Sequence, residues 1–357
     1  MNIGIIGLPQ TGKRALFELL VGKGSASTHA DHRTVVRGVA EVQDPRFDAL
    51  VDLYSPKKTT RARVDVMLLP KIEERAVSEA DVFKDLAEVE AFCHVVRAFE
   101  NDAVYHASGS IDPERDIDFV NAEFILHDLL FVEKRLDRIE KDLQKVKNDR
   151  LQKEREILLK LRTPLESEKP LRVVQIAEED EKVIRGYPLL SRRAMIVVLN
   201  VSDGDVAKQD RVLEIDKRYA DLGIKGIQIG VQIEGEISSL ESDSDRDEFM
   251  CELGVEDTAL HALTEKCIEA LGLISFFTVG PTEVHQWFVR RDASAVEAAG
   301  KIHSDLARGF IRAEVIKIPD LLEAGSEEKV KSSGKLGVRG RDHVVEDGDI
   351  LFIRFNV

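Results

Sequence analysis

The sequence predicts an α/β protein: a domain built on a parallel sheet, a long helical hairpin inserted into that domain, and a strand-rich C-terminal domain. Three observations predict this class. Short apolar runs alternate with helical patterns over residues 1–122 and again from residue 194, as expected for a sheet with helices on both faces. A heptad pattern of apolar residues separates these two regions. Closely spaced β-like runs then fill the chain from residue 274 onward.

The expected domain boundaries follow from these changes of pattern. A chain of 357 residues is long enough for two or three domains. The sheet domain is expected to be discontinuous and to take residues 1–122 and 190–272. The helical insertion takes residues 123–189, and the strand-rich domain takes residues 273–357.

The first domain is organised around the loop Gly7–Arg14. The loop follows an apolar strand that ends at Ile6 and precedes a helical pattern that begins at Ala15. Its spacing, G-x-x-x-x-G-K, is typical of a phosphate-binding loop. The glycines let backbone N–H groups turn toward an anion, and Lys13 would reach the β- and γ-phosphates. The next position usually holds a Ser or Thr hydroxyl for Mg²⁺, and here it is Arg14. A loop retained for the fold alone is the alternative.

The remaining elements of this domain are expected from strand and helix signals in chain order. Strands are expected at residues 39–42, 64–69, 91–99, 194–199 and 226–233. Helical patterns begin at Asp44-Pro45 and at Asp112-Pro113. Residues 22–37 are polar and are expected to form a loop, residues 71–90 are charged and helix-prone, and residues 260–271 are an amphipathic helix.

The heptad pattern predicts two long helices that pack on each other. Apolar residues spaced alternately by three and four positions run from Leu129 to Val146, and leucines resume at sevens from Leu151 to Leu165. Because Lys147–Arg150 interrupts the pattern, a helical coiled-coil hairpin is expected. Residues 133–162 hold 11 basic and 7 acidic residues, a net charge of +4. A solvated coiled coil and an arm that faces RNA or a partner both fit this charge.

The C-terminal domain is expected to have a β-grasp fold, because a short segment supplies several strands and one main helix. The β-like runs are residues 274–279, 283–289, 310–317 and 350–356, the helical run is residues 296–300, and residues 346–349 are the turn before the last strand.

Composition limits the classes of function. The chain has 51 basic and 66 acidic residues, a net charge of −15, so sequence-independent binding of nucleic acid over the whole surface is not expected. Three widely separated cysteines without metal-ligand spacing indicate a reducing environment. We find no signal peptide and no apolar run of about 18 residues that could cross a membrane. A cytoplasmic protein without a membrane partner is expected.

Several stretches together carry a family resemblance. They are residues 7–13, 44–50, 94–100, 109–113, 132–136, 300–305, 308–315 and 345–350. These stretches resemble the YchF/Obg-like ATPase family of P-loop NTPases. The likeness extends over nearly the whole chain, which is identified as a divergent member with degenerate G motifs.

The resemblance implies a P-loop NTPase G-domain, an inserted coiled-coil arm, and a C-terminal TGS domain of ubiquitin-like β-grasp fold. Members of the family prefer ATP over GTP, hydrolyse it slowly and associate with ribosomes. The nucleotide-binding residues implied here are Gln10, Thr11, Gly12, Lys13, Arg14, Ala15, Asn200, Val201, Asp203, Gly230, Val231 and Gln232.

The chain departs from the family where Mg²⁺ and the γ-phosphate would be held. Arg14 replaces the Mg²⁺-binding hydroxyl, and a guanidinium repels a cation but can pair with phosphate oxygens. The family strand that ends in Asp-x-x-Gly has Leu68 at the position of the aspartate and Lys71 at that of the glycine. Since metal-assisted phosphoryl transfer needs the cation, we expect no metal ligand and no catalytic residue among the side chains.

Two further motifs are altered. The switch threonine of the family aligns with His32, and Thr34 is the candidate substitute; an ordinary loop is the alternative. The base-recognition motif keeps Asn200 and Asp203 but lacks the lysine that stacks on the base. Asp203 favours guanine, the family favours adenine, and a helix N-cap is the alternative role of Asp203. His94 lies in an apolar run and is expected to be a core residue.

We therefore expect a protein that binds ATP or GTP weakly, or without Mg²⁺, and turns it over little. Its coiled-coil arm and TGS domain would dock on a ribosome or another RNA–protein assembly. Two alternatives remain. One is a slow ATPase or GTPase in which phosphates and water alone hold Mg²⁺. The other is an interaction scaffold that binds no nucleotide.

Overall fold

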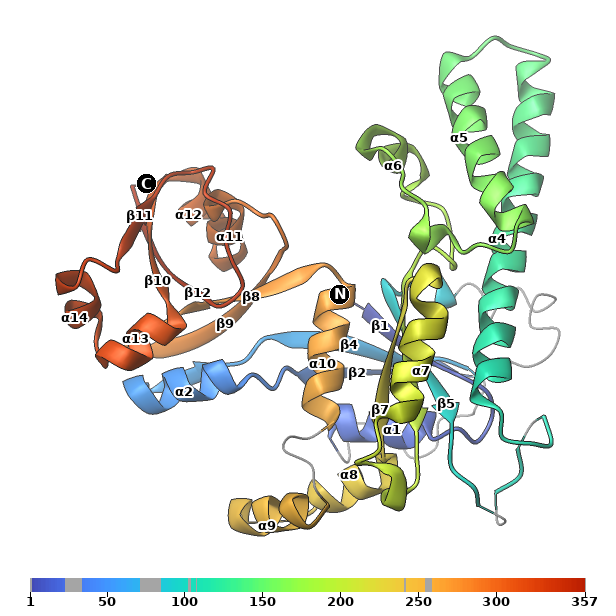
Figure 1. The fold of residues 1–357 in the computed structure, drawn as a ribbon. Helices are drawn as coiled ribbons and strands as arrows, with labels where there is room; N and C mark the ends of the chain where they lie inside the picture. Colours follow the sequence, from blue (N-terminus) through green and yellow to red (C-terminus); the bar gives the residue numbers. More distant parts are fainter. Residues whose placement is uncertain are drawn as a thin grey trace. The chain divides into compact units, whose positions relative to one another are not determined.

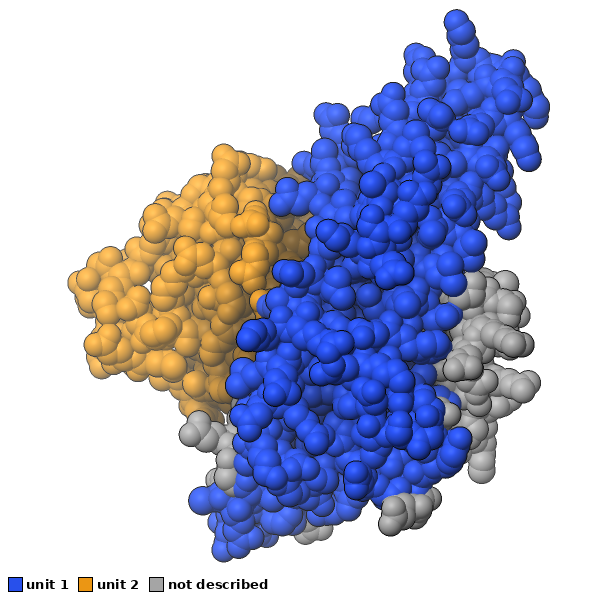
Figure 2. All heavy atoms as spheres, turned by 45° about the vertical axis from the view of Figure 1, so that its right-hand side comes forward, with its two compact units in different colours: residues 1–40, 65–263 blue, residues 41–64, 264–357 orange. Residues whose placement is uncertain are grey.

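The computed structural model describes residues 2–22, 34–70, 85–101, 104–106, 108–240, 242–253 and 259–356. It contains two compact units, coloured separately in Figure 2. Unit 1 comprises residues 1–40 and 65–263, and unit 2 comprises residues 41–64 and 264–357. Most of the loop expected at residues 22–37 and of the helix-prone stretch 71–90, with His32 and Lys71, lies outside the described residues.

Unit 1 is built on a six-stranded sheet (Figure 1). Its strands are β1 (Asn2–Ile6), β2 (Val36–Glu41), β4 (Arg63–Leu68), β5 (Ala91–Arg97), β6 (Ala194–Asn200) and β7 (Ile224–Ile229), in the order β2-β4-β1-β5-β6-β7. β1 pairs in parallel with β4 and β5, and β5, β6 and β7 continue in parallel. All residues of β5 are buried, which is typical of a central strand covered on both faces. The predicted parallel sheet is therefore confirmed.

Besides the helices of residues 113–184, which are described below, unit 1 has several helices that follow its strands. They are α1 (Lys13–Val21), η3 (Asp203–Asp205), α7 (Asp210–Tyr219), η4 (Ala220–Leu222), α8 (Val231–Ile237), α9 (Asp243–Leu253) and α10 (Ala259–Ala270), of which the last continues into unit 2. The strand expected at residues 226–233 was placed too far along the chain, because α8 already begins at Val231. Asn200 Oδ1 accepts the N–H of Val231 over 3.1 Å and so holds the start of this helix.

Helices α4 (Pro113–Leu143) and α5 (Asp149–Glu166) form the expected hairpin (Figure 1). Asp112 caps α4 by accepting the N–H of Arg115 over 3.1 Å, so the helix starts well before the predicted insertion. Its first turns bury Ile117, Val120 and Phe124 in the core of the sheet domain. Its later turns bury Val132, Leu136 and Ile139 against Ile157, Leu158 and Leu161 of α5. One continuous helix therefore belongs to both the sheet domain and the hairpin.

The foot of the hairpin is fixed by Asp128, which is fully buried on α4. Its carboxylate accepts the N–H groups of Leu190 and Ser191, each over 2.8 Å, and the hydroxyl of Ser191 over 2.6 Å. The chain reaches this point through η2 (Leu171–Val173) and α6 (Glu178–Ile184). These bonds hold the returning chain just before it enters β6.

Unit 2 has a six-stranded mixed sheet. Its strands are β3 (Lys58–Thr60), β8 (Leu273–Thr278), β9 (Glu283–Arg290), β10 (Phe310–Lys317), β11 (Gly337–Arg339) and β12 (Asp349–Phe355), in the order β11-β10-β12-β8-β9-β3. β8 and β12 are parallel, with antiparallel β9 and β10 outside them. The helices are α2 (Pro45–Tyr54), α11 (Ala295–Ile302), α12 (Ser304–Arg308), α13 (Ile318–Ala324) and α14 (Glu327–Ser332). This strand order confirms the predicted β-grasp fold.

Residues 41–64 are the main difference from the expected division of the chain, which placed them in the sheet domain. In the structure they belong to unit 2. β3 pairs in parallel with β9 at the edge of the second sheet, and Phe47 and Leu50 of α2 lie in a core cluster with Phe277 and Ile350. None of the helices in the described parts of the chain is both long and apolar enough to cross a membrane.

Candidate functional site

The loop between β1 and α1 has a backbone that only glycine adopts easily at its two motif positions. Gly7 has φ of +148° and Gly12 has φ of +97°, in the region that strains other residues. Space is also lacking, because a Cβ at Gly7 would collide with the carbonyl oxygen of Val95 and one at Gly12 with the side chain of Asn200. The two glycines of the motif therefore shape this loop, as the sequence predicts.

Lys13 closes the loop on itself. Its Nζ donates to the carbonyl oxygens of Gly7 and of Leu8, the latter over 3.0 Å. The Thr11 hydroxyl also donates to the Leu8 oxygen, over 3.2 Å. Lys13 thus lies at the first position of α1 with its ammonium group held over the loop, where an anion bound by the backbone N–H groups would meet it.

Asn200, at the end of β6, connects the predicted binding segments of unit 1. Its Nδ2 donates to the carbonyl oxygen of Thr11 over 3.0 Å, and its Oδ1 accepts the N–H of Val231 over 3.1 Å. The Gly7–Arg14 loop, the end of β6 and the Gly230–Val231 turn are therefore brought together, although they are far apart in the sequence. Val201 is buried directly after Asn200.

Two of the predicted residues, Asp203 and Gln232, are exposed. Asp203 is exposed and begins η3. The alternative that it caps a helix is wrong, since Ser202 occupies the N-cap position of η3. Gln232 lies on the exposed side of α8, where its amide donates to Glu236 over 3.4 Å.

A cavity of about 460 Å³ lies against the loop. It is lined by Pro9, Gln10, Thr11, Gly12, Lys13, Arg14, Ala15, Thr34, Leu68 and Leu69. Arg14 and Leu68 therefore border the same space as Lys13. No carboxylate is present among these described lining residues. Arg14 is only loosely held, with its Nη1 at 4.0 Å from Glu18 one turn along α1.

His94 lies on β5, next to Ile6 in the strand register. It is fully buried, and neither ring nitrogen has a hydrogen-bond partner among the described residues. Burial first, and the positive charge of Lys13 second, lower its pKa from 6.5 to about 3. The ring is therefore neutral, and its buried position agrees with the expected core role.

Sequence reasoning missed a second cavity of about 470 Å³ in unit 1. It lies where β5 and β6 end, and its lining includes Phe99, Glu100, Ser202, Asp205 and Arg211. Arg211 Nη1, on α7, donates to the carbonyl oxygen of Ala98 over 3.0 Å and so joins α7 to the end of β5. The two expected parallel strands could have indicated this cavity, because ligands of open α/β sheets bind outside the carboxyl ends of neighbouring strands.

A parallel sheet whose strand β1 runs through a glycine-framed loop into a helix that begins with lysine defines a P-loop NTPase G-domain. The sequence is 38% identical to the ribosome-binding ATPase YchF of Bacillus subtilis over the whole of both chains. It is 32% identical to Obg-like ATPase 1 of Oryza sativa subsp. japonica, over 100% of this chain and 92% of that one. The chain therefore belongs to the YchF/Obg-like ATPase family.

Two further comparisons agree with this assignment. Residues 273–356 match the family model YchF-GTPase_C, which is described as a protein of unknown function (DUF933). The solved structure of the Schizosaccharomyces pombe YchF GTPase superposes with a TM-score of 0.82 at 25% identity and covers 99% of this chain and 97% of that chain. The likeness thus includes the G-domain, the helical insertion and the C-terminal domain.

Proposed function

We propose that this protein binds ATP or GTP at the Gly7–Arg14 loop with impaired Mg²⁺-dependent hydrolysis, and that it acts as a regulator on ribosomes or another RNA–protein assembly. One observation carries the first part of the proposal: Arg14 and Leu68 line the same cavity as Lys13. The described lining of the cavity therefore offers two cationic groups to phosphates and no carboxylate to a metal ion.

The residues around the loop fit a polyphosphate. The N-terminus of α1 has no side-chain cap and no acidic residue in its first turn, so its backbone N–H groups and dipole can favour an anion. Lys13 would exchange the carbonyl oxygens of Gly7 and Leu8 for phosphate oxygens. Arg14 can leave its distant partner Glu18 and pair with phosphate through its planar guanidinium.

The same residues do not fit a protein-bound Mg²⁺ ion. Mg²⁺ prefers oxygen ligands, and here Arg14 and Leu68 stand at the two positions that supply them in the family. Bound Mg²⁺ would neutralise charge that develops during phosphoryl transfer. Thr34 lines the cavity. Its hydroxyl is the oxygen that the alternative, a slow ATPase or GTPase, would use together with phosphates and water.

Calorimetric titration with ATP and GTP, in Mg²⁺ and in EDTA, tests this proposal. We expect the two Kd values for each nucleotide to agree within about threefold, since the protein adds no ligand to the metal. Lys13→Ala should weaken binding at least about tenfold, or about 1.4 kcal/mol. Lys57→Ala, at an exposed lysine outside unit 1, should change nothing. Strongly Mg²⁺-dependent binding with phosphate release lost in Lys13→Ala would select the slow ATPase or GTPase.

Arg14→Ser extends the same experiment. Restoring the hydroxyl should make binding more Mg²⁺-dependent, but turnover should stay low because Leu68 is unchanged. Rapid hydrolysis by this single variant would contradict the proposal. Undetectable binding of either nucleotide to the wild-type protein, with partner binding intact in Lys13→Ala, would select the scaffold.

The macromolecular part of the proposal concerns residues 123–189 and 273–357, as a coiled-coil arm and a TGS domain beside a G-domain of residues 1–122 and 190–272. The relative from Bacillus subtilis is named a ribosome-binding ATPase. The arm has a net charge of +4 over residues 133–162 in a chain of net charge −15. A locally basic arm on an acidic protein can approach RNA while the rest of the surface disfavours non-specific binding. We place this activity in the cytoplasm.

A further inference from the structure

Residues 41–64 are an integral part of unit 2 and also connect two strands of the unit 1 sheet. α2 buries Phe47 and Leu50 with Phe277 and Ile350 in one core cluster. β3 extends the second sheet by pairing with β9. The chain enters this segment from β2, which ends at Glu41, and leaves it into β4, which begins at Arg63.

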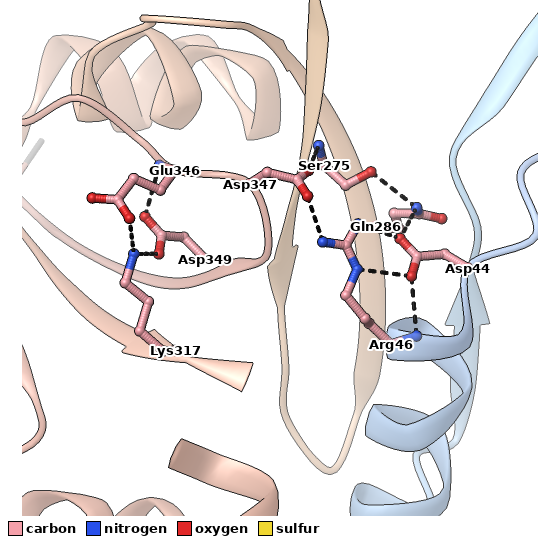
Figure 3. A network of polar contacts seen from close by, with 8 residues as sticks. All are labelled: Asp44, Arg46, Ser275, Gln286, Lys317, Glu346, Asp347 and Asp349. Atoms are coloured by element: carbon pink, nitrogen blue, oxygen red, sulfur yellow. Dashed lines mark hydrogen bonds and ion pairs between the residues drawn. The ribbon is translucent and has the colours of Figure 1, made fainter. Parts of the chain in front are cut away.

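Both ends of the segment converge on Gln286 of β9, which is 1% exposed. Its Nε2 donates to Asp44 over 3.1 Å, and its Oε1 accepts the N–H of Ala62 over 3.3 Å. The N–H of Val42 also donates to the carbonyl oxygen of Ala62 over 2.9 Å. The start and the end of the segment are thus held side by side at one buried amide, and Figure 3 shows the contact of this amide with Asp44.

Arg46 makes further hydrogen bonds to Asp44, as Figure 3 shows. Its Nε and Nη2 donate to the two oxygens of Asp44 over 3.0 and 2.9 Å, and its Nη1 donates to Asp347 over 2.5 Å. Asp347 in turn accepts the N–H of Ser275 over 2.8 Å. The guanidinium therefore ties the segment to the turn before β12 and to strand β8. We call Asp44, Arg46, Gln286 and Asp347 the joint.

The two strands that leave the joint both lead to the cavity at the Gly7–Arg14 loop. β2 and β4 are neighbours at the edge of the unit 1 sheet. Thr34 lies two residues before β2, Leu68 is the last residue of β4, and both line the cavity. Six extended residues span roughly 20 Å. We call this strand pair, which adjoins residues 41–64 in the sequence and leads along the chain to two residues that line the cavity, the β2–β4 ribbon.

We infer that the β2–β4 ribbon couples the nucleotide cavity to the C-terminal domain, with Arg46 as a positioning residue. The coupling runs through the covalent chain: the joint fixes the ribbon at its origin and thereby restricts Thr34 and Leu68. By reciprocity, a ligand that shifts these two residues changes the stability of the joint by the same free energy. The inference has a mechanical half, that the joint restricts the ribbon, and a nucleotide half, that it thereby changes nucleotide affinity. Only the nucleotide half rests on the proposed function.

Hydrogen exchange without nucleotide tests the mechanical half. The N–H of Leu69 donates to Ile5 over 3.1 Å, at the cavity end of the ribbon. In Arg46→Ala, and less in Arg46→Lys, we expect this amide to exchange at least about fivefold faster than in wild type. Lys335→Ala, which removes two exposed ion pairs from the same unit, should leave it unchanged. Faster exchange confined to residues 41–64 and β9, with Leu69 unaltered in both Arg46 variants, would overturn the inference.

Nucleotide affinity tests the other half with the same proteins. Couplings between sites are commonly about 5- to 150-fold, so we expect Arg46→Ala to weaken ATP binding at least about fivefold and Lys335→Ala to leave Kd unchanged. Wild-type affinity in a folded Arg46→Ala protein would overturn the coupling while the proposed function stands. If the wild-type protein binds no nucleotide, the proposed function fails. The exchange rate of the Leu69 amide still decides whether a change at the joint affects the cavity end of the ribbon.

Discussion

Single side chains decide what the loop of unit 1 can hold. Asn200 shows this most directly, because one amide satisfies the carbonyl oxygen of Thr11 and the N–H of Val231. Lys13 adds its own bonds to Gly7 and Leu8, so the loop is shaped before any ligand arrives. A preformed backbone of this kind reduces the ordering cost of binding an anion.

His94 gives a prediction at this scale. The pKa of His94 is about 3 in the folded state and 6.5 in the unfolded state. Between these pH values the unfolded chain therefore binds a proton at His94 that the folded chain does not bind. The contribution of neutral His94 to the free energy of unfolding is therefore fully present above about pH 6.5, and it is lost as the pH falls toward 3. Relative to His94→Gln, the free energy of unfolding should fall by about 1.4 kcal/mol per pH unit between pH 6 and 4, measured by urea denaturation. Parallel pH profiles of the two proteins would contradict this.

The sequence predicted much of the site because its signals are local. The two glycines and Lys13 lie within seven residues. The expectation that Arg14 and Leu68 belong to the same site came from their motif positions alone. The position of Asp203 was less predictable. Whether a residue after a strand faces a ligand depends on the turn that follows, and here η3 leaves Asp203 exposed.

At the scale of elements, the hairpin is a continuous extension of the sheet domain. α4 runs without interruption from the sheet core into the hairpin. Arg135 and Glu154 join α4 to α5 over 2.6 Å, and Asp128 fixes the returning chain.

The arm gives a prediction at this scale. Lys145→Glu with Lys147→Glu reverses two exposed charges at the tip and should weaken ribosome binding at least about tenfold, because phosphate contacts dominate such affinities. Co-sedimentation with purified ribosomes at several salt concentrations measures this. Lys57→Glu with Lys217→Glu makes the same change of net charge elsewhere and should have little effect. Equal losses in both variants would show that net charge alone matters.

Heptad spacing predicted the hairpin well, since packing between two adjacent helices is a local property of the sequence. The start of α4 was visible at Asp112-Pro113. β3 was missed because its structure depends on a distant part of the chain. Lys58–Thr60 has only three polar residues, and its extended structure depends on β9, more than 200 positions along the chain.

At the scale of the whole molecule, the division into units does not follow the order of the chain. The matched family model begins at residue 273, yet part of the core of that domain comes from α2. No composition signal marks residues 41–64, because helix and strand patterns look alike in either domain. The contacts of Phe47, Leu50 and Asp44, together with the pairing of β3 and β9, assign them.

The isolated C-terminal region should therefore not fold. A protein of residues 264–357 lacks Phe47 and Leu50, and loss of a single large core side chain costs about 2–5 kcal/mol. We expect it to unfold without a cooperative transition in circular dichroism melts. The same region fused through a flexible linker to residues 41–64 should unfold cooperatively. A cooperative melt of residues 264–357 alone would contradict the assignment of the segment.

The early position of α2 in the chain has a consequence for synthesis. Phe47 and Leu50 leave the translating ribosome long before β8 and β9, whose residues complete their surroundings. At about 5–20 residues per second, the wait is roughly 10 to 50 s. During this time the apolar face of α2 has no native partner on the nascent chain, which makes residues 45–54 a stretch on which a cotranslational chaperone can act.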